Sequence, residues 1–108
     1  MGISVEIAGC TEYLNEKEKA MLVAMGKEYK KEYETELFIK DLDLHAFRKD
    51  NETLRNNILL SLYLRNYMTY TKSCCAIEFG KIASVLLTTK AFNLFNSDAF
   101  EAWLAEEK

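Results

Sequence analysis

The chain of 108 residues contains no proline. Proline ends helices and stiffens linkers because it lacks a backbone N–H and fixes φ. Helices are therefore free to run the length of any apolar-periodic segment in this chain. Hydrophobic residues make up 49% of the sequence, which suffices for one core at this length. We find no repeat and no low-complexity linker, so the sequence predicts a single domain over residues 1–108.

The first helix is predicted over residues 15–34. Asn15 can cap it, and Glu18 stands three residues later, where a capping box requires it. Apolar side chains then recur at four-residue intervals along one face, at Met21, Met25, Tyr29 and Tyr33. We expect this Met/Tyr face to contribute to the core. The alternative is an adaptable binding surface, since both residue types suit such interfaces.

Two further helices are predicted over residues 51–70 and 98–107. The first has Asp50 or Asn51 as its cap and is apolar almost all round, so we expect it to be the central, buried helix. The second begins at Asp98, an acidic residue that favours the positive end of a helix.

The fourth helix is predicted over residues 73–89. Ser73 can cap it, and apolar residues recur along one face beside a stripe of small residues. Residues 91–95 either continue this helix or turn away from it.

Strand signals are few. Residues 3–7 alternate between apolar and polar side chains, as a short strand does. Residues 37–47 fit a strand and a short helix equally well, and a strand over 38–44 could pair with 3–7. The predicted fold class is therefore mainly α: a bundle of about four helices, with a possible two-stranded ribbon.

Composition excludes several classes of protein. The net charge is −3 and only the middle third of the chain has a small positive excess, so a non-specific binder of phosphate backbones is disfavoured. No apolar run is long enough to span a membrane. The three cysteines are odd in number and two are adjacent, at Cys74 and Cys75, which is typical of a reduced, cytoplasmic protein.

The sequence offers one weak candidate for metal binding or catalysis. Asp41, Asp43 and His45 alternate along the ambiguous segment, so a strand there would place two carboxylates and an imidazole on one face. A helix would separate them. The simpler interpretation is a polar, solvent-facing side. No catalytic or cofactor motif accompanies them, so we predict no cofactor and a protein that is not an enzyme; a metal-dependent enzyme is the third hypothesis.

A second hypothesis is nucleic-acid binding by a transcriptional regulator with a helix-turn-helix. Ala76, Gly80 and Leu86 have approximately its spacing. The expected recognition helix, residues 83–92, lacks the Arg, Gln and Asn side chains that read base edges. This hypothesis therefore ranks below the first.

The leading hypothesis is a small cytoplasmic protein that binds another protein as a regulator or inhibitor, of the kind that phages and mobile elements encode. The chain has six tyrosines and six phenylalanines but no catalytic motif. Large aromatic side chains dominate interface hot spots. A homo-oligomer is compatible with this hypothesis. The predicted partner-binding residues are Tyr29, Lys30, Tyr33, Phe95, Phe100 and Trp103.

Overall fold

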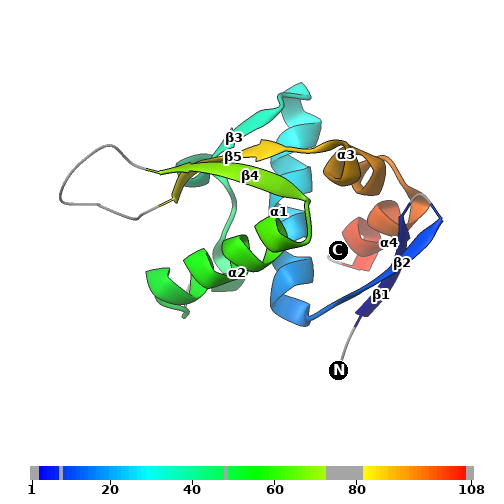
Figure 1. Cartoon of the computed structure of the whole chain (residues 1–108), viewed down its shortest axis with the longest axis horizontal. Coiled ribbons are helices and arrows are strands. Elements are labelled where there is room, and N and C mark those ends of the chain that lie inside the picture. Colours follow the sequence, from blue (N-terminus) through cyan, green and yellow to red (C-terminus); the bar gives the residue numbers. More distant parts are fainter. Residues whose placement is uncertain (1–2, 8, 48, 73–81, 107–108) are drawn as a thin grey trace.

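A computed structural model describes residues 3–7, 9–47, 49–72 and 82–106, and these residues form an α+β fold (Figure 1). Within them, four α-helices accompany one two-stranded and one three-stranded sheet. The prediction of a mainly α bundle was therefore wrong. The strand over 68–72 begins within the predicted helix 51–70, and the strand over 82–87 lies within the predicted helix 73–89. A third strand, over 10–14, lies in a segment for which no structure had been predicted.

The N-terminal sheet is a hairpin of β1 (Ile3–Ile7) and β2 (Cys10–Leu14). Gly9 lies between the strands with φ +85°, a backbone conformation that favours glycine. The predicted strand over 3–7 is confirmed, but its predicted pairing with residues 38–44 was wrong. The adjacent segment can pair by closing a much shorter loop, which costs less chain entropy.

Helix α1 (Glu16–Glu32) confirms the predicted first helix and its capping box. The Glu18 amide donates to the Asn15 side chain at 2.7 Å, and the Asn15 amide donates to the Glu18 carboxylate at 2.9 Å. The helix ends at Tyr33, which adopts φ 56°. Eight of its residues are buried, so α1 is the central helix of the core.

Helix α2 (Glu52–Leu64) begins where predicted, with the Asn51 side chain accepting from the Leu54 amide at 2.8 Å. It ends at Leu64 rather than near Tyr70, and it buries only one face, so it is not the central helix. Asn66 has φ 69° and redirects the chain into strand β4 (Met68–Lys72). The β-branched and aromatic residues of that strand favour an extended backbone.

The larger sheet has the order β3-β5-β4, with both pairings antiparallel, and combines β3 (Glu36–Phe38) and β5 (Ile82–Leu87) with β4. The predicted helix over 73–89 was therefore wrong over residues 82–87. Residues 73–81, which include Cys74, Cys75, Ala76 and Gly80, lie outside the described residues. A short apolar run cannot be distinguished from a helix segment by periodicity alone, and here it is the central strand.

A β-bulge changes the direction of side chains at the start of β5. Ser84 pairs with Thr71 and Ile82 pairs with Lys72, so Ala83 is the extra residue. In a regular strand, Ile82 would share the outer face of the sheet with Ser84. The extra residue turns Ile82 into the core instead, where it is 3% exposed. The bulge therefore explains why Ile82 and Ser84, two residues apart, lie on different faces of the sheet.

Helices α3 (Thr89–Phe95) and α4 (Asp98–Glu106) complete the fold. The predicted C-terminal helix is confirmed, and residues 91–95 belong to a separate short helix. Helix α4 lies against α1 at Gly26, where an added Cβ would come within 2.1 Å of the Phe100 ring. Figure 1 shows α1 beside the three-stranded sheet, with α2 on one side of α1 and with α3 and α4 on its other side.

Candidate binding cleft

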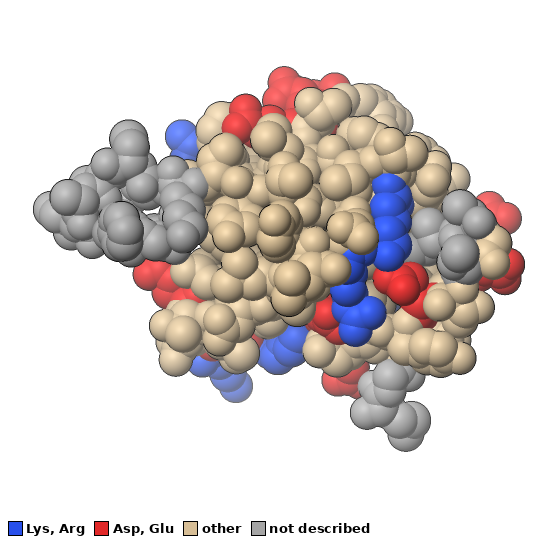
Figure 2. All heavy atoms as spheres, viewed as in Figure 1, with Lys and Arg blue, Asp and Glu red and all other residues tan. Residues whose placement is uncertain are grey.

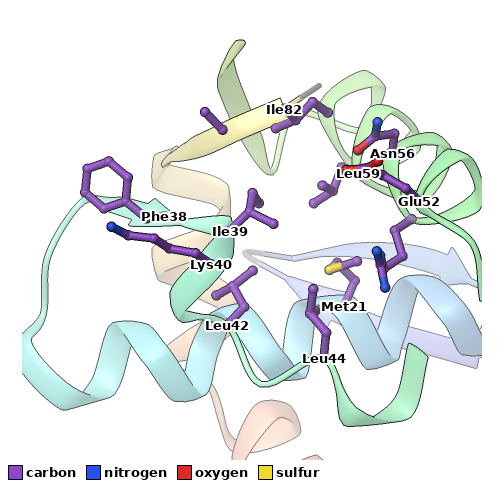
Figure 3. Close-up of a pocket in the computed structure, with 12 residues that line it drawn as sticks. Met21, Phe38, Ile39, Lys40, Leu42, Leu44, Glu52, Asn56, Leu59 and Ile82 are labelled. Atoms are coloured by element: carbon purple, nitrogen blue, oxygen red, sulfur yellow. The ribbon is translucent and has the colours of Figure 1, made fainter. Parts of the chain in front are cut away.

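A cleft of about 630 Å³ lies beside the start of β5 (Figure 3). Four parts of the chain form it: α1, α2, the bulged end of β5, and the end of β3 with the loop that follows it. That loop contains two 3₁₀ turns, Ile39–Asp41 and His45–Phe47. This size lies within the range of clefts that bind small ligands or the anchor side chains of a partner.

The floor of the cleft is apolar. Met21, Leu42, Leu59 and Ile82 line it, and each is less than a tenth exposed. In Figure 3 these side chains converge on a common space from α1, the loop, α2 and β5. Ile82 is part of this floor because the bulge at Ala83 turns it inward.

One face of α2 forms one wall of the cleft. Arg55 and Asn56 lie three and four residues after Glu52, and Leu59 lies four and three residues after them, so the four side chains share this face. Tyr63 follows Leu59 by four residues, is 40% exposed, and continues the same face beyond the cleft. Its ring contacts that of Tyr70 edge-on, with centroids 5.2 Å apart. The apolar surface is therefore longer than the cleft itself.

Phe38 and Lys40 form the opposite rim (Figure 3). Phe38 is 44% exposed, and the Lys40 ammonium lies 5.9 Å from the centroid of its ring. Among the residues that the structure describes, the rim thus carries two cations, Lys40 and Arg55, and one carboxylate, Glu52. Neither cation forms an ion pair with another described residue. The rim is therefore positive on a chain whose net charge is −3.

The structure does not align Asp41, Asp43 and His45. Residues 37–47 are neither one strand nor one helix, so the alternation that would have placed the three side chains on one face is absent. All three residues are exposed, and the Asp43 carboxylate accepts a hydrogen bond from the His45 amide at 3.2 Å. Among the described residues, no three His, Cys, Asp or Glu side chains are close enough to hold a metal ion.

The proposed recognition helix over residues 83–92 is also absent. Its first part is strand β5, and α3 begins only at Thr89. Ser84 is 1% exposed, and its hydroxyl is engaged with Thr71 at 2.6 Å and Glu36 at 2.9 Å. This segment therefore does not present the base-reading surface of a helix-turn-helix.

The six predicted partner-binding residues form one contiguous cluster between α1, α3 and α4. Ring centroids are 5.3 Å apart for Tyr29 and Tyr33, 5.6 Å for Tyr29 and Phe95, 5.1 Å for Phe95 and Phe100, and 6.2 Å for Phe100 and Trp103. Lys30 lies over the Phe100 ring and pairs with Glu101.

Most of this aromatic cluster is core. Tyr29, Phe95, Phe100 and Trp103 are buried, whereas Tyr33 is 65% exposed. The Met/Tyr face of α1 is accordingly core at Met21, Met25 and Tyr29, as expected, and reaches solvent only at Tyr33. In the structure, the cluster therefore offers a partner one exposed ring rather than a broad aromatic surface.

Glu18 is a buried carboxylate outside the cleft. Burial alone would raise its pKa, but hydrogen bonds from the Asn15 amide, from Arg65 at 2.8 Å and from Ser61 at 3.0 Å lower the pKa below its usual 4.5. The carboxylate is thereby held ionised by its neighbours on α1 and α2. We interpret it as a structural connection between the two helices.

A second polar connection joins β2 to α3. The Lys90 ammonium donates to the Glu12 carboxylate at 2.6 Å and lies 4.6 Å from the centroid of the Tyr67 ring. Burial, and then the neighbouring Glu12 charge, raise the pKa of the Tyr67 phenol. In the view of Figure 2, lysine and arginine side chains gather in a short column with acidic side chains beside it, next to a broad uncharged area.

Sequence reasoning did not find the cleft. Its lining residues come from four separate segments, and no motif connects them. The one local signal was the face of α2 on which Glu52, Arg55 and Asn56 interrupt an otherwise apolar helix.

Comparisons with protein-family models, with curated proteins and with solved structures gave no match. Among the helices formed by the described residues, none is long and apolar enough to cross a membrane.

Proposed function

We propose that this protein is a protein-binding module that regulates or inhibits a macromolecular partner, and that it binds this partner at the cleft. One observation carries the proposal: an apolar, concave surface with an exposed aromatic side chain, Phe38, and two cations at its rim that form no ion pair with any described residue. Buried apolar pockets surrounded by polar side chains are where interface hot spots concentrate.

The chemistry of the described residues supports binding rather than catalysis. The buried carboxylate Glu18 and the buried phenol of Tyr67 are both engaged by neighbours within the chain. Neither lines the cleft. The cytoplasmic compartment, indicated by the odd number of cysteines, remains part of the proposal, as does an accessory role in a phage or mobile element.

The proposal is tested by quantitative affinity capture from native cells, with and without nuclease. Wild type is compared with Phe38→Asp at the rim of the cleft and with Tyr13→Asp on the hairpin, because both aromatic side chains are exposed. We expect a nuclease-resistant protein that wild type and Tyr13→Asp retain and that Phe38→Asp loses. Equal retention by all three would refute the cleft as the binding site. Recovery that nuclease abolishes would favour nucleic-acid binding.

A further inference from the structure

We infer that the cleft accepts a segment of the partner in which bulky apolar side chains are flanked by Asp or Glu. This inference rests on the proposed function and specifies the chemistry of the partner. It follows from the different character of the floor and the rim of the cleft.

The floor determines the apolar part of the partner segment. Met21, Leu42, Leu59 and Ile82 provide hydrocarbon and thioether surface at the bottom of the cleft. A bulky apolar side chain that enters is transferred from water to an apolar surface, which is favourable. A polar side chain would lose its hydration without finding a partner there.

The rim determines the charge of the flanking residues. Lys40 stands at one rim and Arg55 on the wall formed by α2, so cations lie on both sides of the apolar floor. Within the described part of the chain neither forms an ion pair, and Glu52 is the one carboxylate of the lining. A carboxylate on either side of the apolar anchor would therefore meet a cation. Arg55 can donate two parallel hydrogen bonds to that carboxylate.

The extent of the surface favours a chain segment over a small molecule. The face of α2 that lines the cleft continues to the half-exposed ring of Tyr63, and Phe38 projects at the other side. A peptide segment can cover the cleft and these flanking rings together. A small acid would fill the cleft and leave them exposed.

The test is selection from a displayed random peptide library against the immobilised full-length protein. The informative variant reverses both rim cations, Lys40→Glu with Arg55→Glu. The control variant makes the same change in charge elsewhere, Lys19→Glu with Lys31→Glu, at two lysines that pair with Glu106 and Glu28. Thermal unfolding of each variant verifies that it is folded.

We expect wild type and the control variant to select peptides with a bulky apolar residue next to Asp or Glu. Each ion pair should favour the acidic residue by about fivefold, the upper end for exposed pairs. The rim variant should bind these peptides at least roughly tenfold more weakly and select Lys or Arg instead.

Several outcomes would overturn the inference. Peptides that lose binding in Phe38→Asp but show no acidic preference would leave the cleft as the binding site and refute its charge selectivity. Peptides that bind all variants equally would refute the cleft itself, and with it the proposed function. A dimer that the rim variant dissociates would assign the cleft to a second copy of the chain. A stoichiometric small acid in native mass spectrometry would assign it to a small ligand.

Discussion

Replacing Gly26 with alanine should destabilise the protein, although the same change usually stabilises a helix. The added Cβ would lie 2.1 Å from Cζ of Phe100 and 2.8 Å from both of its Cε atoms. Carbon atoms prefer separations of about 3.5 Å or more, so the ring has to move by more than about 1 Å. Phe100 is fully buried, and its ring contacts those of Phe95 and Trp103, so any movement of the ring displaces other core side chains.

The magnitude follows from two opposing effects. Alanine gains about 1 kcal/mol over glycine within a helix. Overpacking a well-filled core costs about 1–3 kcal/mol, and an overlap this large on a fully buried ring belongs at the upper end. The expected net loss is about 2 kcal/mol, which lowers the midpoint of thermal unfolding by roughly 10 °C for a domain of this size.

Thermal and urea unfolding, followed by far-UV circular dichroism, measure the effect. Phe100→Leu supplies the matched background because it removes the ring that the new methyl group meets. In the Phe100→Leu protein, Gly26→Ala should lower the free energy of unfolding by about 1–2 kcal/mol less than it does in wild type. A Gly26→Ala protein as stable as wild type, or the same cost in both backgrounds, would refute the packing of α4 against α1.

Three smaller predictions concern the polar connections. Because the pKa of Glu18 is lowered, its contribution to stability is complete above about pH 4.5 and is lost as the pH falls. Glu18→Gln should therefore be less stable than wild type near neutral pH, and its free energy of unfolding should fall less as the pH is lowered. The same fall in both proteins, measured by urea unfolding in acid, would contradict this. Because the pKa of Tyr67 is raised above its usual 10.0, the protein should lose stability as the pH rises above 10. Tyr67→Phe should lose less stability over the same range. Unfolding midpoints measured at alkaline pH test this, and an equal loss in both proteins would contradict it. Ser84→Ala should lower the free energy of unfolding in urea by about 1 kcal/mol, because Thr71 and Glu36 lose the buried hydroxyl that they share. An unchanged free energy of unfolding would show that these hydrogen bonds across the sheet contribute nothing.

Local signals in the sequence were sufficient to predict α1, the start of α2, and β1. The capping box at Asn15 and Glu18 identified the start of α1, and Asn51 identified the start of α2. These motifs act through neighbouring backbone amides, so they depend little on distant residues. The alternation of residues 3–7 likewise identified β1.

The larger sheet could not be predicted because its strands depend on distant partners. Residues 82–87 form an apolar run that suits a buried helix as well as a central strand, and β3 and β4 decide between the two. The bulge at Ala83 further removed the alternation that marks a strand. The missing proline made a mainly helical chain plausible, but it only permits helices and does not require them.

The candidate site likewise depends on contacts between residues that are distant in the sequence. The six aromatic and basic residues chosen from the sequence do lie together, because the C-terminal aromatic side chains pack on the Met/Tyr face of α1. Their residue types could not reveal that four of them are buried. The cleft is lined by residues of the bulge, of the 3₁₀ turn at Ile39–Asp41 and of α2, which no single sequence motif connects.

The most direct test of the binding cleft is site-specific photo-crosslinking in native cells. A photoreactive phenylalanine analogue replaces Phe38 at the rim of the cleft or, in a second protein, Tyr13 on the distant hairpin. We predict one dominant, nuclease-resistant protein adduct from position 38 that is missing from position 13. The crosslinked segment of the partner should contain a bulky apolar residue beside Asp or Glu. An adduct that forms only from position 13, or equally from both, would contradict the account.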